Sequence, residues 1–161
     1  MKKQTIFIIL GILLVIVIGV IALFSSLNKE KISITANEFK TFMQDKGYSV
    51  LDETNLYSQY DYVKQVCIAE QTDNSYQIEF YELSDVEHAN TIYNNNKSKL
   101  ETSKGNVSGE TSVSMKNYSK YSLTTDGKYN VISRIDNTLI FLEVDSNYKN
   151  VVKELLDELG Y

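Results

Sequence analysis

The chain has 161 residues, of which 43% are hydrophobic and 23% are charged, and its formal net charge is −5. This length fits one folded domain of ordinary size with a tail, and it is too short for two such domains. Cys67 is the single cysteine, so no internal disulfide can form. Cys67 and His88, the single histidine, supply only two of the roughly four ligands of a structural zinc site. We therefore expect no disulfide framework, no metal centre and no cofactor.

An unbroken apolar run, Ile6 to Phe24, lies close to the start of the sequence and contains 19 residues without a charge. As an α-helix it would be about 29 Å long, close to the roughly 30 Å hydrocarbon core of a bilayer. The run therefore predicts a transmembrane helix. It is longer than the apolar stretch of about 7–15 residues in a removable signal peptide, which favours an uncleaved signal-anchor. Cleavage after Ala22, which would give a secreted protein, is the alternative.

The charges around this run bear on its orientation. Lys2 and Lys3 precede it, and Lys29 and Lys31 follow it, so the lysines alone do not decide. The free amino terminus adds positive charge in front, and long following domains are translocated largely regardless of charge. We therefore expect a cytoplasmic N-terminus, a single pass through the cell membrane and an extracytoplasmic domain. The basic tail, signal-anchor, polar stalk and domain then span residues 1–5, 6–24, 25–33 and 34–161.

The part of the chain after the apolar run is acidic. All 21 acidic residues but only 14 of the 16 basic residues follow position 27. Binding to a nucleic-acid backbone depends on clustered Lys and Arg, so we expect no nucleic-acid partner. An overall charge of this sign also disfavours lying on an anionic membrane surface.

Three amphipathic segments predict helices in the domain. The first two begin with the spacing of a capping box, at Thr35–Glu38 and Ser84–Glu87, and the second ends near Gly105. The third begins near Asp145 or Ser146. The residues expected on the buried helix faces are Phe39, Phe42 and Met43, then Val86, Ala89, Tyr93 and Leu100, then Tyr148, Val151, Leu155 and Leu159.

Seven segments have the composition or the alternation of β-strands. Thr72–Asn74 joins two of them as a hairpin, and Asp126–Gly127 and Asp136–Asn137 mark turns of a later meander. Residues 53–62 show no clear period, and we expect a loop there. The expected strands are 48–52, 63–71, 75–83, 111–115, 118–124, 128–135 and 138–144.

The order of these elements predicts an α+β domain. We expect an antiparallel sheet, built from a β-hairpin and a β-meander, with about three helices packed on one face, preceded by the transmembrane helix. The strand–turn–strand–helix units that begin at Asp73 and Asp136 resemble each other. Duplication and repeated use of the same turn and cap chemistry explain this equally well.

Two residues with reactive side chains show patterns that favour a structural role. His88 lies one position before the expected buried Ala89, so we expect it at the surface and predict that His88→Ala leaves any activity intact. Cys67 lies in an apolar strand, and we expect it to be packed rather than reactive. No spacing of Asp and Glu singles out a pair for glycoside hydrolysis. We therefore assign no catalytic, cofactor-binding or metal-binding residue.

Three tyrosines stand within six residues of the expected loop: Tyr57, Tyr60 and Tyr62. Exposed tyrosines offer a large contact area with a polar tip, which is common on binding surfaces. We mark these three as a candidate partner-binding patch, with ordinary packing as the alternative. The tyrosines of the meander alternate along their strands and are expected to be structural: Tyr118, Tyr121 and Tyr129.

The layout of the whole chain, with a basic start, one apolar span and a compact domain, resembles a known class of envelope proteins. These are the small, functionally uncharacterised membrane-anchored extracytoplasmic proteins of low-GC Gram-positive bacteria. The stretches Tyr76–Leu83 and Lys153–Tyr161 are similar in character to such proteins. Lys, Ile, Asn and Tyr make up 56 of the 161 residues, which fits an AT-rich bacterial genome. The resemblance implies a location but transfers no active-site residue.

These observations predict a non-catalytic binding or interaction module of the bacterial envelope. Its partners would be the membrane, through Ile6–Phe24, and another envelope protein or a small ligand. Tethering raises the local concentration near such partners. The alternatives are an envelope-directed hydrolase that uses carboxylates, and a secreted protein released by signal-peptide cleavage.

Overall fold

The computed structural model describes residues 30–161, and a compact unit runs from Lys31 to Tyr161. The expected cytoplasmic tail, the expected transmembrane helix (residues 6–24) and most of the stalk lie outside the described residues. Within the described part, no helix combines the length and the apolar character needed to cross a membrane.

The described residues form three α-helices, two short 3₁₀ helices and seven strands. The helices are α2 (Ala36–Asp45), η1 (Thr54–Tyr57), α3 (Val86–Thr102), η2 (Ser146–Tyr148) and α4 (Lys149–Glu158). The strands are β1 (Ser49–Asp52), β2 (Val63–Glu70), β3 (Gln77–Leu83), β4 (Val107–Ser114), β5 (Tyr118–Thr125), β6 (Lys128–Ile135) and β7 (Thr138–Asp145). The predicted α+β class is confirmed.

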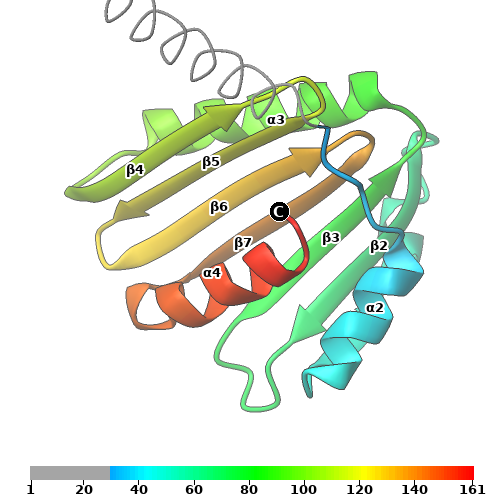
Figure 1. Ribbon diagram of the computed structural model, residues 1–161, viewed down its shortest axis with the longest axis horizontal. Coiled ribbons are helices and arrows are strands. Elements are labelled where there is room, and N and C mark those ends of the chain that lie inside the picture. The colour runs from blue at the N-terminus through cyan, green and yellow to red at the C-terminus, as the bar shows by residue number, and fades with distance from the viewer. Residues whose placement is uncertain (1–29) are drawn as a thin grey trace, which may run out of the picture. The chain divides into compact units, whose positions relative to one another are not determined.

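All seven strands belong to one antiparallel sheet with the order β1-β2-β3-β7-β6-β5-β4 (Figure 1). The predicted hairpin is β2–β3, and the predicted meander is β4–β5–β6–β7. The two parts join where β3 pairs with β7, with Phe80 opposite Ile140 and Glu82 opposite Thr138. The last strand of the chain therefore lies at the centre of the sheet.

The predicted turns fold through residues with positive φ. Asp126 and Gly127 have φ of 49° and 77°, as the two-residue turn between β5 and β6 requires. Asp136, with φ of 48°, opens the next turn, and Asn74, with φ of 55°, lies in the β2–β3 turn. Asn and Asp tolerate this region better than other residues with a Cβ, so the turn chemistry helps to fix the register of the three hairpins.

The larger core lies between one face of the sheet and helices α2 and α4. Phe39 of α2 stacks on Phe80 of β3 at 4.8 Å between ring centroids. Leu156 of α4 and Ile140 of β7 belong to the same buried cluster. Figure 1 shows α2 and α4 on the near side of the sheet and α3 behind it.

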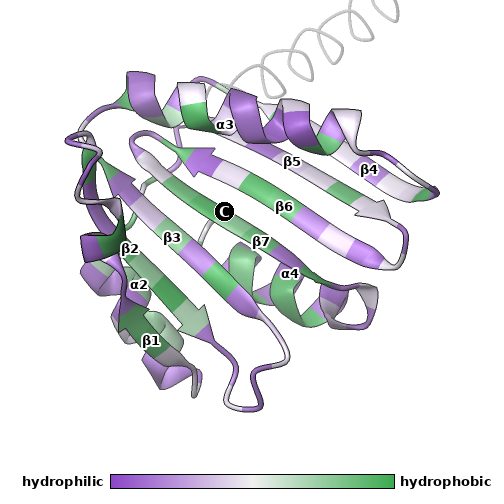
Figure 2. Cartoon of the chain, turned by 180° about the vertical axis from the view of Figure 1, so that it is seen from behind, coloured by the Kyte–Doolittle hydropathy of each residue, from purple (hydrophilic) through white to green (hydrophobic). Residues whose placement is uncertain are grey.

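Helix α3 packs on the opposite face, so the prediction that all helices cover one face is wrong. Ala89 and Tyr93 form a second buried cluster with residues of β3, β5, β6 and β7, which are Leu83, Tyr121, Leu123, Ile132 and Leu139. Seen from this side, α3 lies in front of the sheet (Figure 2). The physical reason lies in β6 and β7, where neighbouring residues on both faces are buried. Such strands need cover on both sides.

The helix starts partly follow the predicted capping boxes. In α2 the box is confirmed, because the Thr35 hydroxyl accepts from the Glu38 N–H at 3.2 Å and the Glu38 carboxylate accepts from the Thr35 N–H at 2.7 Å. In α3 the N-cap is Asp85 and not Ser84, since the Asp85 carboxylate accepts from the His88 N–H at 2.9 Å. The predicted Ser84–Glu87 box is therefore wrong by one residue.

Several further predicted details differ. The η2 turn takes the first residues of the expected last helix, and Val151, expected inward, is 48% exposed while Val152 is buried. Strand β4 begins at Val107 rather than 111, and η1 lies inside the expected loop 53–62. The three meander tyrosines are buried as expected: Tyr118, Tyr121 and Tyr129.

Candidate functional site

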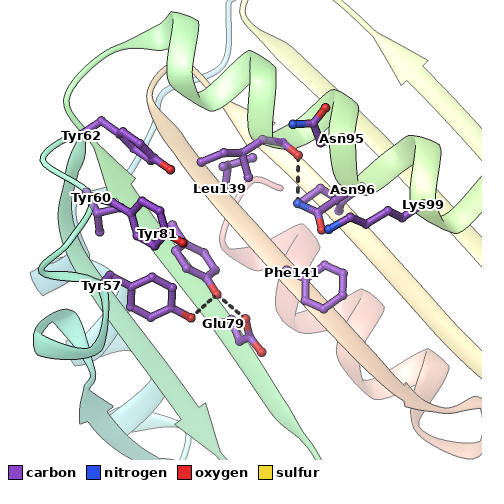
Figure 3. A pocket seen from close by; sticks show the side chains of 13 residues that line it. Tyr57, Tyr60, Tyr62, Glu79, Tyr81, Asn95, Asn96, Lys99, Leu139 and Phe141 are labelled. Carbon is purple, nitrogen blue, oxygen red and sulfur yellow. Dashed lines mark hydrogen bonds between the residues drawn. The ribbon is translucent and has the colours of Figure 1, made fainter.

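A pocket of about 580 Å³ opens on the α3 face of the sheet. One wall is the segment from η1 to the start of β2, the other wall is α3, and β3, β6 and β7 form the floor (Figure 3). We call it the tyrosine pocket. Its lining residues are Tyr57, Tyr60, Tyr62, Val63, Glu79, Tyr81, Ile92, Asn95, Asn96, Lys99, Ile132, Leu139 and Phe141.

A chain of hydrogen bonds fixes two of the tyrosines. The Tyr81 hydroxyl donates to Glu79 Oε2 at 2.5 Å, and the Tyr57 and Tyr81 hydroxyls lie 3.1 Å apart (Figure 3). The rings of Tyr57 and Tyr81 meet edge to face with centroids 5.6 Å apart. Burial, and then the hydrogen bond to Glu79, raise the pKa of the Tyr81 phenol well above its usual value. The phenol therefore stays neutral and keeps its proton at neutral pH.

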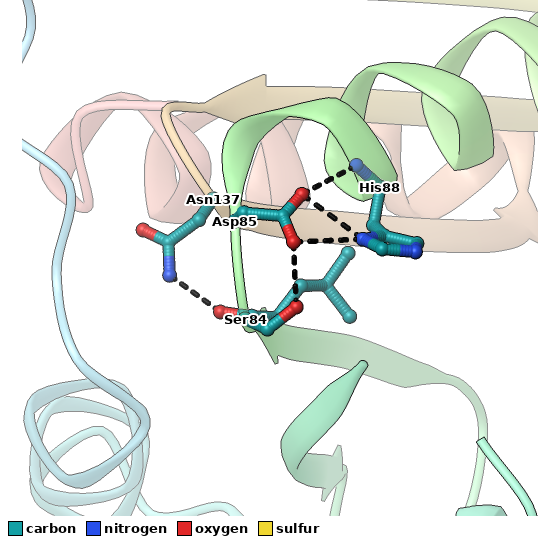
Figure 4. A network of polar contacts seen from close by, with 5 residues as sticks. Ser84, Asp85, His88 and Asn137 are labelled. Atoms are coloured by element: carbon teal, nitrogen blue, oxygen red, sulfur yellow. Dashed lines mark hydrogen bonds and ion pairs between the residues drawn. The ribbon is translucent and has the colours of Figure 1, made fainter. Parts of the chain in front are cut away.

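The outer part of the same wall is a stack of aromatic rings. Tyr60 is 42% exposed, and its ring centroid lies 5.6 Å from that of Tyr62. The Tyr62 ring in turn stacks on the His88 imidazole at 4.5 Å, with the planes 11° apart. Asp85 orients this imidazole, because its carboxylate lies 2.8 Å from Nδ1 (Figure 4). Such aromatic contacts hold rings in place at low cost in side-chain entropy.

The α3 wall carries three polar side chains beside Ile92, and the part of the floor formed by β6 and β7 is apolar. Asn95, Asn96 and Lys99 lie along one side of α3, with the spacing of one helical turn between Asn95 and Lys99. The Asn96 amide donates to the Ile92 carbonyl at 2.9 Å. The apolar floor consists of Ile132, Leu139 and Phe141.

Hydrogen bonds hold the carboxylate of the pocket and several other carboxylates of the described domain. Among the described residues that line the pocket, Glu79 is the one carboxylate, and it is already an acceptor for Tyr81. The described carboxyl groups with shifted pKa values all have them lowered, chiefly by hydrogen bonds: Glu38, Asp52, Asp73, Asp85 and Glu110. No group of metal-ligating side chains occurs in the part of the chain that the structure covers.

The three tyrosines marked from the sequence line one pocket together. Sequence reasoning missed the partners on other elements, which are Glu79, Tyr81, Asn95, Asn96, Lys99 and Phe141. Two of these residues could have been predicted from the alternation of side chains along β3, which places Glu79 and Tyr81 on the face opposite Phe80. Which loop would face them depends on tertiary packing.

His88 and Cys67 occupy the environments expected for them. The His88 side chain is 45% exposed in its contact with Asp85. Cys67 is fully buried, and burial raises the pKa of its thiol. Burial and a raised thiol pKa are typical of a cysteine that packs in a core.

Comparison with protein-family models, with curated proteins and with solved structures gives no match. The geometry of the site is therefore the basis for assigning its function.

Proposed function

We propose that this chain is a non-catalytic binding module of the bacterial envelope, held in the cell membrane by Ile6–Phe24 with its domain outside. The tyrosine pocket then binds a small ligand or a segment of another envelope protein. The observation that carries this proposal is the meeting of four tyrosines with the polar side of α3 over an apolar floor. The envelope location is supported by the sequence.

The chemistry of the walls defines the ligand that fits. Tyrosine faces and the apolar floor favour a flat apolar or aromatic surface, and the amides of Asn95 and Asn96 favour polar groups along one edge. Small-molecule sites combine these features in about 300–1,000 Å³, a range that includes the volume of this pocket. The exposed Tyr60 at the rim is available for first contact.

The single carboxylate of the pocket supports binding over the hydrolase alternative. Glycoside hydrolysis by carboxylates needs two of them on opposite sides of the scissile bond. Glu79 has no second carboxylate beside it among the described lining residues, and it accepts a hydrogen bond from the Tyr81 hydroxyl. The Glu79 carboxylate thus holds the Tyr81 side chain in place.

Site-specific photo-crosslinking in native membranes tests this proposal. A benzoylphenylalanine replaces Tyr60 at the pocket rim, and a matched chain carries it at Leu56, which is 69% exposed on the same segment but does not line the pocket. We expect a discrete crosslinked product from position 60 and none of that mass from position 56.

A second substitution assigns the product to the pocket. Phe141→Ala in the chain with the probe at 60 removes part of the apolar floor without touching the probe, and we expect it to lower the yield at least about fivefold. Equal products from positions 56 and 60, or a yield unchanged by Phe141→Ala in a folded chain, would overturn the proposal.

A further inference from the structure

A second hollow, of about 320 Å³, lies on the opposite face of the sheet, beside α4. This is the part of that face formed by β4, β5 and β6. We call it the lysine hollow, and its lining residues include Lys120, Lys149, Lys153, Ser122 and Thr124. It shares no lining residue with the tyrosine pocket.

Three lysines from two elements converge on it. Lys120 comes from β5, and Lys149 and Lys153 lie one turn apart on α4. Lys149 Nζ donates to Thr124 Oγ1 at 2.9 Å and lies 5.1 Å from the centre of the Tyr129 ring. Among the described residues, no Asp or Glu carboxylate lies within 4.0 Å of these three ammonium groups.

The acidic groups of this region face elsewhere or act at longer range. Glu110 follows Gly109 on β4, but its carboxylate binds Lys104 Nζ and the Tyr121 hydroxyl, and Tyr121 belongs to the core on the α3 face. Glu110 therefore contributes backbone to the hollow. Asp157 raises the pKa of Lys120, but burial and the charges of Lys31 and Lys153 lower it.

The remaining lining groups of the hollow are hydroxyls. Ser122 and Thr124 lie on β5 on the same face as Lys120, and Thr111 lies opposite Ser122 on β4. Lys120 Nζ donates to the O atom of Tyr161, the last residue of the chain, at 3.0 Å, which leaves ammonium hydrogens for another acceptor. Cations and hydroxyl donors thus share one concave surface in a domain whose overall charge is negative.

We propose that Lys120, Lys149 and Lys153 form a binding site for a phosphate group, with the hydroxyls of Ser122 and Thr124 as additional donors. A phosphate carries about two charges at neutral pH and several acceptor oxygens, so it matches donors that approach from a strand and a helix. A carboxylate has one charge and a planar pair of oxygens, and it cannot engage three ammonium groups equally. The inference does not depend on the tyrosine pocket.

Binding of inorganic phosphate to the full-length chain in a non-ionic detergent tests this site. Equilibrium dialysis at pH 7.4 and low ionic strength measures Kd for the wild type and for Lys149→Gln/Lys153→Gln. Lys120 is left in place because it is half-buried. We expect saturable binding by the wild type and a Kd at least about tenfold higher for the double variant.

The matched control removes two lysines elsewhere. Lys46 and Lys64 are exposed and lie outside the hollow, so Lys46→Gln/Lys64→Gln changes the net charge by the same amount. We expect its Kd to stay within about twofold of the wild type. Absence of saturable binding by the wild type below about 10 mM, or equal weakening in the two double variants, would overturn the proposal.

The same measurement in nanodiscs identifies the source of the phosphate. A phosphatidylglycerol bilayer offers phosphate headgroups without a second cation, and phosphatidylcholine serves as the neutral reference. If a headgroup occupies the hollow, free phosphate binds about tenfold more weakly in phosphatidylglycerol discs, and this difference disappears in Lys149→Gln/Lys153→Gln. Equal affinity in both discs identifies a soluble phosphate compound as the ligand.

Discussion

Asp85 connects the start of α3 with the wall of the tyrosine pocket. Its carboxylate accepts from the His88 N–H at 2.9 Å and from the Ser84 hydroxyl at 2.8 Å, and it also contacts His88 Nδ1 (Figure 4). The first of these bonds satisfies an N–H at the helix start that has no partner within the helix. Since His88 stacks on Tyr62, the same carboxylate that caps α3 also positions a ring of the pocket wall.

Replacing Asp85 tests its role at the start of α3. We expect Asp85→Ala to lower the thermal midpoint by a few degrees and Asp85→Asn to lower it less, because an amide oxygen also accepts the cap hydrogen bond. In the folded chain the hydrogen bonds from His88 and Ser84 lower the pKa of the Asp85 carboxyl below its usual value of 3.8. Stability from this group is therefore fully present above about pH 4 and is lost as the pH falls through the lowered pKa.

Thermal unfolding of the three chains between pH 7 and pH 2 measures this effect. The gap between the wild type and Asp85→Ala narrows at the acid end, since protonation removes the charge-assisted bonds. A gap of constant size across the whole range would show that the carboxylate charge does not stabilise the start of α3.

Strand β3 connects the two cores. Phe80 lies on the face covered by α2 and α4, and Tyr81 lies on the face of the tyrosine pocket. Phe80 is fully buried, stacks on Phe39 and meets the Tyr161 ring edge to face at 6.3 Å. The strand thus holds α2 and the C-terminal residue on one side while it presents Tyr81 on the other.

Truncation of Phe80 measures how much this contact stabilises the sheet. We expect Phe80→Ala to lower the free energy of unfolding by about 3–5 kcal/mol, from lost burial and the cavity left behind. The control is Val151→Ala on exposed α4 surface, with an expected change within about 0.5 kcal/mol. Urea unfolding followed by circular dichroism gives both values. If Phe80→Ala does not fold, Phe80→Leu provides the measurement, and a loss no larger than that of Val151→Ala would contradict the assignment.

Local patterns predicted the strands and turns well because their causes are local. Asp126–Gly127 and Asp136–Asn137 specify hairpins through their own backbone preferences, and the alternation of Ile78 and Phe80 specifies a half-buried strand. The faces of the helices were not predictable in the same way. Val131 and Ile132 are both buried, which indicates cover on both sides but does not say which helix supplies it.

The candidate site shows the same division between local and tertiary causes. Tyr57, Tyr60 and Tyr62 stand out in the sequence because they are neighbours. Tyr81 joins them only because β2 and β3 pair, and Asn96 only because α3 crosses the sheet on that face. The start of β4 was missed because its residues, Val107–Ser114, are mostly polar and pair only with β5 at the sheet edge.

On the scale of the whole molecule, the tyrosine pocket and the lysine hollow lie on opposite faces of one sheet. The start of the compact unit is fixed at a third place, where the Lys31 N–H donates to Asn117 Oδ1 at 3.0 Å and the Asn117 amide donates to the Lys31 carbonyl at 2.8 Å. The Lys31 ammonium also lies 3.7 Å from the centre of the Tyr118 ring. The chain therefore enters the domain beside the β4–β5 turn.

The predicted membrane topology can be tested with introduced cysteines, because the one native thiol, that of Cys67, is buried. Cys67 is fully buried, so a membrane-impermeant maleimide leaves the folded wild type unlabelled. Leu56→Cys provides a reactive position on the domain, since Leu56 is 69% exposed, and Gln4→Cys provides one in the expected cytoplasmic tail. In intact cells we expect labelling at position 56 at once, and at position 4 only after the membrane is permeabilised.

The orientation and the anchor give separable results in this experiment. Labelling of position 4 but not of position 56 in intact cells would show that the orientation is the reverse of the expected one, since the reagent reaches only the outer side. A signal peptide that is removed would instead leave position 56 reactive in a chain found in the medium, with a mass lower by about the first 22 residues. The apolar run is as long as the bilayer core is thick, and Leu23 and Phe24 continue it beyond the candidate cleavage site at Ala22. Both features favour the intact mass in the membrane fraction.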